Sequence, residues 1–508
     1  MNVGSLLTTN AIRLPDKIAV IEGDKRVSYR EFNNKVNLIG SSLVALDIKK
    51  GEKVAVFLHN CLEWAEIYFA ISKIGAVIVP INYRIIGNEL LHVIGNSNST
   101  VLIFGEELQK VVESVKPHLK KIKYYIFVGS NPPSWSIDYK EFSKIPSSKK
   151  PEVFISEEDA HTICYTSGTT GLPKGAVLTN LNVIMCHYYM TTSEFSINRN
   201  DVFLITTPLC QRIGWGKLVN SIALGCSLVM MGSFDPVKAM ELMEKERITI
   251  ASIIPSIGKM MLQIPHIESY DSSSLRMFFV TGEAFPIETK LGLIKKFPHV
   301  KLLSYFASTE AALISVMRPE DISRKPDSVG QPIVGLEVKI LDDAGDEVPI
   351  GQVGEIVTRC GRPGVFSTMK GYYKNPEADT ETFLNDWIKT GDIGRFDDER
   401  FLYILDRKRD MIISGGYNIY SREVEMVLES HPKVAEVAVV GVSDEKYGEA
   451  VKAYVVLRPG QKSNKEEMIQ YCKEKLANYK KPKYIEFINS LPRNSVGKVL
   501  KYKLKGGS

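Results

Sequence analysis

The segment YTSGTTGLPKG, Tyr165 to Gly175, combines residue types that bind phosphate groups. Its glycines allow positive φ angles and a close approach of the backbone to a ligand, its Ser and Thr hydroxyls donate hydrogen bonds, and Lys174 adds a positive charge. It differs from a Walker P-loop, because Lys174 is followed by Gly175 and Ala176 rather than by Ser or Thr. The sequence therefore predicts a polyanion-binding loop between ordered elements, with phosphate as the first candidate ligand.

Four further motifs follow this loop along the chain. They are YFASTE (305–310), KTGD (389–392), DRKRDMIISGG (406–416) and LPRNSVGKVLK (491–501). With these five motifs in this order, nearly the whole chain resembles the adenylate-forming enzymes: acyl-CoA synthetases, luciferases and the adenylation domains of peptide synthetases. The resemblance implies an α/β fold with a large N-terminal domain, 1–405, of parallel-rich sheets, helices and a small distorted β-barrel. A hinge at 406–410 and a small, mobile α+β C-terminal domain, 411–508, would complete it.

Activation of a carboxylate by ATP requires attack on the α-phosphate and loss of pyrophosphate, so catalysis depends on positioning and positive charge. The resemblance implies that Thr309 donates to a phosphate oxygen, that Glu310 binds Mg²⁺ and that Asp392 accepts hydrogen bonds from the ribose hydroxyls. Arg407 would reach the nucleotide. The β- and γ-phosphates would contact Thr166, Ser167, Gly168, Thr169, Thr170, Gly171 and Lys174. The adenine side would comprise Phe306, on the ring itself, with Ala307, Ser308, Gly282, Glu283 and Ala284.

The C-terminal motifs are expected to serve two successive reactions. The resemblance implies that Lys498 enters the site from the small domain and bridges the attacking carboxylate and the α-phosphate. Rotation about Arg409, where relatives usually carry Asp or Lys, would remove Lys498 and bring Gly415 and Gly416 toward a tunnel for the pantetheine arm of CoA.

The elements that position these motifs alternate between strands and helices. The first third contains a strand in EKVAVFLHN (52–60), a helix in 62–75 with an apolar stripe at Trp64, Ile67, Tyr68 and Ile71, and strands in 76–82 and 100–105. The same order recurs over 226–255 and 275–306, which favours βαβ units and a largely parallel sheet. Residues 328–360 indicate antiparallel strands with a tight turn at DDAGDE. The last hundred residues predict a compact α+β unit, with Ser421 as the N-cap of a helix over 422–430.

Composition limits the class of protein. The 508 residues are 44% hydrophobic with a net charge of +5, and no window approaches the length of an apolar membrane span. The N-terminus lacks a signal-peptide pattern, so a cytoplasmic location is expected. Seven scattered cysteines indicate neither a disulfide framework nor a zinc site. The basic tail contains no nucleic-acid-binding motif, and a homodimer is possible.

The segment PLCQRIG, 208–214, departs from the family pattern Pro-Leu-Phe-His-x-x-Gly. Gln211 replaces the histidine and cannot become cationic, and Arg212 follows it. In one interpretation Arg212 faces the acyl pocket and pairs with a polar or anionic group of the acid. In the other it faces solvent, and the pocket takes a plain acyl chain.

Three functions are compatible with the sequence. The first is an AMP-forming acid–CoA ligase that acts on a carboxylic acid, with a fatty acid as the expected substrate. The second is a stand-alone adenylating enzyme that loads a carrier protein, which is disfavoured because GGYNIYSREVE matches the CoA ligases better. The third is an inactive nucleotide-binding scaffold, which is disfavoured because Lys174, Glu310, Asp392 and Lys498 are all present.

Overall fold

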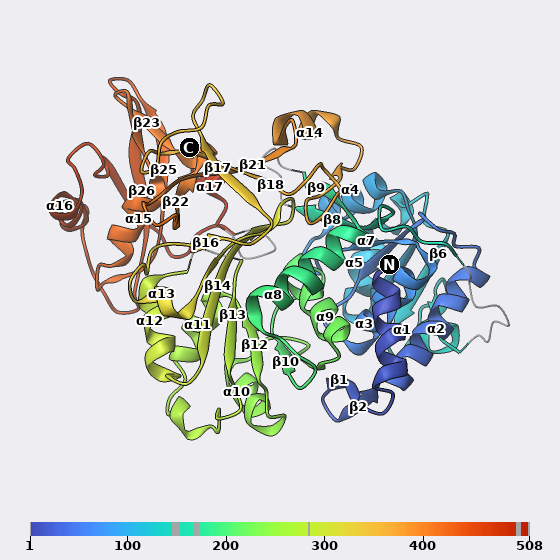
Figure 1. The fold of residues 1–508 in the computed structure, drawn as a ribbon. Helices are drawn as coiled ribbons and strands as arrows, with labels where there is room; N and C mark the ends of the chain where they lie inside the picture. The colour runs from blue at the N-terminus through green and yellow to red at the C-terminus, as the bar shows by residue number, and fades with distance from the viewer. Residues whose placement is uncertain (1, 145–152, 167–171, 283–284, 494–498, 506–508) are drawn as a thin grey trace. The chain divides into compact units, whose positions relative to one another are not determined.

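The computed structural model describes residues 2–144, 153–166, 172–282, 285–493 and 499–505 (Figure 1). These residues form two compact units. The first comprises Met1–Val338 and Thr358–Ile388, and the second comprises Lys339–Val357 and Lys389–Ser508. The expected division at a hinge over 406–410 stays a prediction.

The first unit contains a sheet with nine strands in its described part. Its central six strands, from β14 to β1, are parallel, and the edge strands are antiparallel. Helices join successive parallel strands, which confirms the predicted βαβ units. In spatial order the strands are β16 (Gln331–Pro332), β15 (Ala312–Met317), β14 (Lys301–Ser308), β13 (Met277–Val280), β12 (Ile250–Ile253), β10 (Val202–Ile205), β11 (Ser227–Met230), β1 (Ile18–Glu22) and β2 (Lys25–Ser28).

A second sheet of the same unit has eight strands among the described residues. Strands β8 to β7 are parallel, whereas β9 runs antiparallel to β8 and to β19. β9 therefore returns beside β8 directly after the expected phosphate loop. The order is β19 (Gly371–Tyr372), β9 (Lys174–Thr179), β8 (Ala160–Thr166), β4 (Val77–Pro80), β3 (Lys53–Phe57), β5 (Ser99–Gly105), β6 (Tyr124–Val128) and β7 (Ile137–Asp138).

Helices cover both sheets (Figure 1). They are α1 (Val3–Arg13), α2 (Tyr29–Ala45), α3 (Leu62–Ile74), α4 (Gly87–Ser97), α5 (Gln109–Val115), α6 (Tyr139–Phe142), α7 (Asn180–Ile184), α8 (Thr191–Phe195), α9 (Arg212–Leu224), α10 (Pro236–Lys245), α11 (Pro255–Leu262), α12 (Ile287–Lys296), α13 (Pro319–Ile322) and α14 (Pro376–Thr382). A π-helix, η3 (Met185–Met190), joins α7 to α8, and short 3-10 turns η1 (Glu106–Leu108), η2 (Lys116–His118) and η4 (Ile267–Ser269) complete the unit.

Helix α3 is buried on nearly all of its faces. The expected stripe of Trp64, Ile67, Tyr68 and Ile71 is buried, but so are Leu62, Ala65, Glu66, Phe69 and Ala70 on its other faces. The ring of Tyr68 stacks between those of Trp64 and Trp215, at centroid distances of 5.4 and 5.9 Å. Because Trp215 belongs to α9, this stack packs α3 against the helix that begins within the PLCQRIG segment.

Most residues of the remaining two sheets belong to the second unit, whereas the strand Phe383–Leu384 belongs to the first. In one of these sheets, β17 (Glu337–Leu341), β18 (Gly354–Arg359), β21 (Trp387–Phe396) and β20 (Phe383–Leu384) are neighbours, β22 (Leu402–Arg407) pairs with β21, and the ends of several strands extend into the first unit's residues. Asp342 accepts backbone N–H bonds from Ala344 and Asp346 at 2.9 and 3.0 Å, which confirms the predicted turn. That this sheet forms a distorted barrel stays a prediction.

The C-terminal part of the second unit is the expected α+β arrangement. Its strands are β24 (Tyr417–Ile419), β23 (Ile412–Ser414), β26 (Gly448–Leu457), β25 (Val434–Asp444) and β27 (Tyr484–Phe487). Its helices are η5 (Lys408–Asp410), α15 (Ser421–Glu429), α16 (Lys465–Lys475) and α17 (Lys501–Lys505). Buried Val and Leu side chains of α15, β25 and β26, isoleucines of β23, β24 and β27, and Met468 of α16 form its core. The α/β fold class expected from the sequence is confirmed.

The predicted cap of α15 is wrong. Ser421 is the first helical residue, and Tyr420 occupies the N-cap position without a side-chain cap. The carboxylate of Asp406 instead accepts the backbone N–H of Ser421, so a residue at the end of β22 satisfies the helix terminus.

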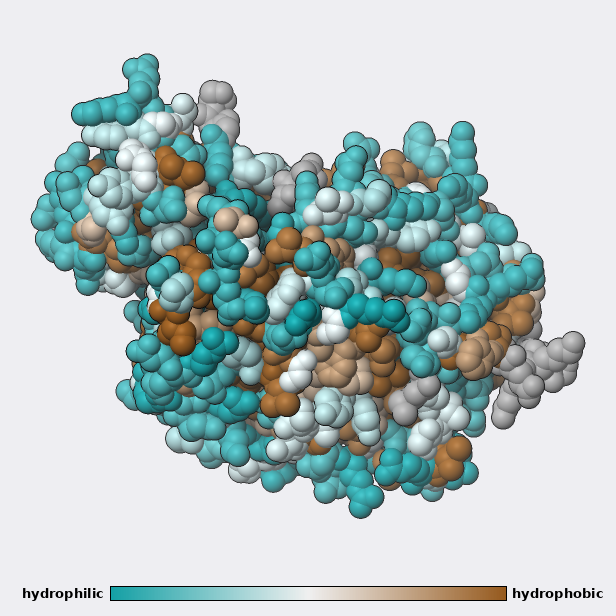
Figure 2. Space-filling view, turned by 45° about the horizontal axis from the view of Figure 1, so that its top comes forward, coloured by the Kyte–Doolittle hydropathy of each residue, from teal (hydrophilic) through white to brown (hydrophobic). Residues whose placement is uncertain are grey.

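Hydrophobic side chains lie mainly in the interior. On the face shown in Figure 2, hydrophilic residues predominate and hydrophobic ones form small, interrupted patches. Among the described residues, no helix combines the length and the apolar character needed to cross a membrane.

Candidate active site

Several predicted site residues of the first unit follow the carboxyl ends of neighbouring parallel strands. Arg212 follows β10, Gly282 follows β13, and Thr309 and Glu310 follow β14. In the sheet these strands lie in the order β14, β13, β12, β10, so the segments after them meet at one edge. This edge is where open α/β sheets bind ligands.

Glu310 is the centre of the first cluster. Its Oε1 accepts a hydrogen bond of 2.8 Å from the Tyr372 hydroxyl, and the Thr166 hydroxyl lies 3.4 Å from the same oxygen. Burial, followed by the Glu310 charge, raises the pKa of Tyr372, so Tyr372 keeps its proton and remains a donor. The structure thus joins the YFASTE motif to Thr166 of the Thr/Gly loop.

Lys174 lies beside this cluster at the start of β9. Its Nζ is 3.5 Å from Glu381 Oε2 and 5.7 Å from the centre of the Tyr372 ring. The Thr166 hydroxyl donates to the Lys174 carbonyl at 3.4 Å, which closes the base of the loop. The intervening predicted phosphate ligands Ser167, Gly168, Thr169, Thr170 and Gly171 lie outside the described residues.

Arg212 is buried, with 8% of its surface exposed, so the solvent-facing interpretation is wrong. Its Nη1 donates to the carbonyl of Thr309, and its buried Nη2 has no hydrogen-bond partner among the described residues. The PLCQRIG segment and the YFASTE turn are therefore in direct contact. Gln211 occupies the N-cap position of α9 without a side-chain cap.

The expected adenine side contains a glycine with a positive φ angle and a hairpin with a register shift. Gly282 has a φ of +102°, a backbone conformation that residues other than glycine rarely adopt. Phe306, Ala307 and Ser308 pair with β15 in a ladder whose register shifts between Phe306 and Ala307. Such bulges often re-aim side chains next to active sites. Glu283 and Ala284 lie outside the described residues.

In the second unit, Asp392 and Arg407 are brought together. They are opposite each other in the β21–β22 ladder, and Arg407 Nε lies 2.8 Å from Asp392 Oδ1. Gly391 takes a φ of +71° directly before Asp392, and the Thr390 hydroxyl accepts the Asp392 backbone N–H at 3.1 Å. The KTGD motif is therefore a fixed bend that places a buried carboxylate beside a guanidinium.

Gly415 and Gly416 form the two-residue loop of the β23–β24 hairpin. Their φ angles are +58° and +82°, as a type I′ hairpin turn requires. Both glycines are thus explained by the turn, and their role toward CoA stays a prediction. Lys498 lies outside the described residues.

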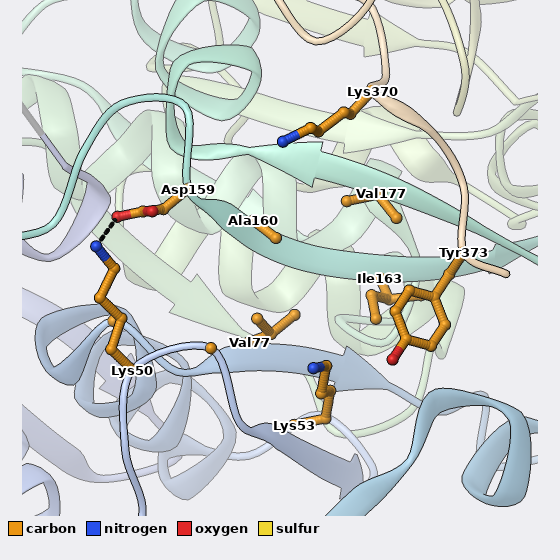
Figure 3. Close-up of a pocket in the computed structure, with 11 residues that line it drawn as sticks. Lys50, Lys53, Val77, Asp159, Ala160, Ile163, Val177, Lys370 and Tyr373 are labelled. Atoms are coloured by element: carbon orange, nitrogen blue, oxygen red, sulfur yellow. Dashed lines mark ion pairs between the residues drawn. The ribbon is translucent and has the colours of Figure 1, made fainter.

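A separate pocket of about 360 Å³ lies over the β9, β8, β4 and β3 strands of the first unit (Figure 3). Its floor is apolar, from Val77, Ala160, Ile163 and Val177. Lys50 at its edge forms an ion pair of 2.6 Å with Asp159. None of the predicted nucleotide-binding residues lines this pocket.

Sequence reasoning missed Tyr372, His187 and Lys217. Tyr372 stands in no quoted motif, but the structure places its hydroxyl on Glu310. His187 and Lys217 are both buried near Arg212, in η3 and α9. A lysine in the middle of an otherwise apolar helical segment was the one available signal for this group.

Two family models match separate parts of the chain. Residues 7–373 match the model of the AMP-binding enzyme family, and residues 423–498 match that of the AMP-binding enzyme C-terminal domain. A long-chain-fatty-acid–CoA ligase of Mycobacterium tuberculosis is 33% identical over 515 residues, which cover 99% of this chain and 98% of that protein. A 2-succinylbenzoate–CoA ligase of Bacillus licheniformis is 33% identical over 498 residues, which cover 96% and 97%. The structure of the o-succinylbenzoate–CoA synthetase of Bacillus subtilis with ATP and a magnesium ion superposes with a TM-score of 0.86 at 30% identity, covering 98% of this chain and 99% of that one.

Proposed function

The chain belongs to the AMP-binding enzyme family, and we propose that it is an AMP-forming acid–CoA ligase that activates a carboxylic acid in two steps. First, a carboxylate oxygen attacks the α-phosphate of ATP, pyrophosphate leaves, and an acyl-adenylate forms. Second, the thiol of CoA loses its proton and attacks the acyl carbon, the bond from that carbon to the phosphate oxygen breaks, and AMP leaves with that oxygen.

The observation that carries this proposal is the cluster around Glu310. The hydroxyls of Thr166 and Tyr372 contact its carboxylate, and Lys174 lies beside the Tyr372 ring at the end of a loop typical of phosphate binding. An oxygen-rich site of this kind fits Mg²⁺, which Glu310 would hold and which would neutralise charge on the phosphates. Lys174 and the Thr/Gly loop would hold the phosphates, and Thr309 would donate to one of their oxygens.

In the second unit, Asp392 would accept hydrogen bonds from the ribose, with its position fixed by Arg407 at 2.8 Å. Lys498 would serve adenylate formation only, and the Gly415–Gly416 turn would approach CoA in the second step. The acid itself differs among relatives, which are fatty-acid and 2-succinylbenzoate ligases.

A screen of carboxylic acids by pyrophosphate release, with and without CoA, tests the proposal. We expect at least one acid to give pyrophosphate and AMP, with a CoA thioester when CoA is present. Acid-dependent pyrophosphate release without any thioester would favour the carrier-protein alternative. Absence of acid-dependent pyrophosphate release from the whole screen would contradict both.

A further inference from the structure

Lys217 is a buried amine with no acidic partner. Its side chain belongs to α9, only 3% of the residue is exposed, and none of the described carboxylates forms an ion pair with it. Nζ lies 4.0 Å from the centre of the Phe279 ring and 5.0 Å from that of Tyr305. The two rings attract the ammonium but do not neutralise its charge. Burial lowers the pKa of Lys217 to about 7, which expresses the cost of keeping the charge there.

The neighbouring groups leave further polar atoms without partners. His187 in η3 is buried, and within the described part of the chain its Nε2 has no hydrogen-bond partner. A side chain at Gly216 would collide with this imidazole, so α9 makes room for it. Burial and the charges of Arg212 and Lys217 lower the pKa of His187, which keeps the ring neutral. Asn220 donates to the His187 carbonyl at 2.5 Å and to the Thr191 hydroxyl at 2.6 Å, which fixes the π-helix against α9.

The cations that face this region are Lys217 and Arg212, and the other titratable groups around it carry no positive charge. Lys217 and Arg212 face it from α9, His187 and the thiol of Cys186 face it from η3, and Tyr305 faces it from β14. Three acidic residues of the first unit each have a partner of their own. Glu194 pairs with Arg318 at 2.6 Å, Asp201 pairs with Arg276 at 2.7 Å, and Glu310 accepts from Tyr372. A buried cation without an anion is costly, so a ligand that brings a negative charge would be favoured.

The position of Lys217 along α9 separates it from the reacting carboxylate. Arg212, at the first turn, contacts Thr309 beside the predicted phosphate site. Lys217 follows five residues later, which is about 7.5 Å along a helix. It is therefore placed to meet the far part of the acid rather than the group that attacks ATP.

We propose that Lys217 is a specificity-determining residue of the acid site, and that the acid carries a second carboxylate which pairs with the Lys217 ammonium between the rings of Phe279 and Tyr305. This inference rests on the proposed acid–CoA ligase function. A plain alkyl chain would leave the ammonium buried and unpaired, whereas a dicarboxylic acid of suitable length supplies the missing charge.

The test compares dicarboxylic acids with monocarboxylic acids of the same length: glutarate with pentanoate, adipate with hexanoate, pimelate with heptanoate and suberate with octanoate. Pyrophosphate release is measured for the wild type, Lys217→Met and Lys290→Met. Lys290 is a matched control, because it is also buried with its pKa lowered to about 8, but its Nζ donates to the Pro326 carbonyl at 2.6 Å.

For at least one length, the wild type is expected to use the dicarboxylate at least tenfold better in kcat/KM. Lys217→Met should abolish this preference, mainly through KM, while Lys290→Met keeps it. Because kcat/KM reports groups of the free enzyme, the wild-type preference should fall as the pH rises through about 7, where Lys217 loses its proton. Lys217→Met should also have a Tm no lower than the wild type without ligand, since it removes an unpaired buried charge.

A wild type that prefers the monocarboxylate at every length, with the same ratio in Lys217→Met, would overturn the inference and leave the proposed function intact. This comparison remains decisive if Lys217→Met fails to fold, because the wild-type preference and its pH dependence need no variant. If none of these acids, nor any acid of the wider screen, releases pyrophosphate, the proposed function itself fails.

Discussion

The hydroxyl of Tyr372 lies 2.8 Å from Oε1 of Glu310, and this hydrogen bond joins β19 to the turn between β14 and β15. A second link between the same segments runs from the Met369 backbone N–H to the Glu310 carbonyl, at 2.8 Å. The carboxylate proposed to hold Mg²⁺ is thus positioned by a segment sixty residues further along the chain.

Tyr372→Phe removes the hydroxyl while keeping the ring beside Lys174. A hydrogen bond to a charged group contributes about 1.5–3 kcal/mol, so kcat/KM for pyrophosphate release is expected to fall about tenfold or more. The Mg²⁺ concentration for half-maximal activity should rise as well, which a loss of stability alone would not produce. Tyr373→Phe, at the pocket of Figure 3, is the matched control. An unchanged Mg²⁺ dependence in Tyr372→Phe would show that Tyr372 does not position the carboxylate.

Glu66 in α3 gives a stability prediction that is independent of catalysis. It is buried and accepts a hydrogen bond of 2.6 Å from the Tyr139 hydroxyl, and burial raises its pKa from 4.5 to about 7. Between these values the unfolded chain loses a proton that the folded protein keeps, so the free energy of unfolding falls as the pH rises. Over this interval the loss amounts to about 3 kcal/mol.

Glu66→Gln removes that titration. The difference between its urea concentration at the unfolding midpoint and that of the wild type should rise from pH 4 to pH 8. Most of this rise should occur between about pH 4.5 and 7. Glu113→Gln, on the exposed side of α5, should run parallel to the wild type. A Glu66→Gln curve that is also parallel to the wild type would refute the raised pKa.

Arg409→Pro tests the hinge inferred from the sequence. Arg409 lies in the 3-10 turn Lys408–Asp410, whose usual φ is close to the value that proline fixes, so the variant should fold with this turn intact. Thioester formation should fall far more than pyrophosphate release in a single turnover, because only the former requires this backbone to rotate. An equal loss in both half-reactions would speak for a general structural defect instead.

Lys498→Ala should separate the half-reactions in the opposite sense. If Lys498 supplies positive charge only during adenylate formation, the variant loses a factor on the order of 10²–10³ in that step. Thioester formation from a supplied acyl-adenylate and CoA should continue near the wild-type rate. Wild-type rates with both substrates would refute the proposed role.

The sequence predicted those parts of the fold whose cause is local. The apolar run of β13 and the tight turn at DDAGDE were predicted, because strand burial and turn formation depend on adjacent residues. The cap of α15 could not be predicted this way. Its terminus is satisfied by Asp406, fifteen residues before Ser421, and only the folded chain brings the two together.

The same distinction applies to the candidate site. Glu310, Lys174 and Asp392 stand in motifs and were predicted from them. Tyr372 stands apart from any motif, and its role depends on the pairing of β19 with β9. The sequence also left the burial of Arg212 undecided, because the residues around it do not reveal that its guanidinium donates to the carbonyl of Thr309.

The most direct test of the central claim follows an oxygen atom. A carboxylic acid that is active in the screen is labelled with the heavy oxygen isotope in its carboxylate and incubated with ATP, Mg²⁺, CoA and the enzyme, and the products are analysed by mass spectrometry. The two-step reaction predicts one labelled oxygen in AMP, unlabelled pyrophosphate and one thioester for each AMP. Label in inorganic phosphate with formation of ADP, or AMP without label, would contradict the account.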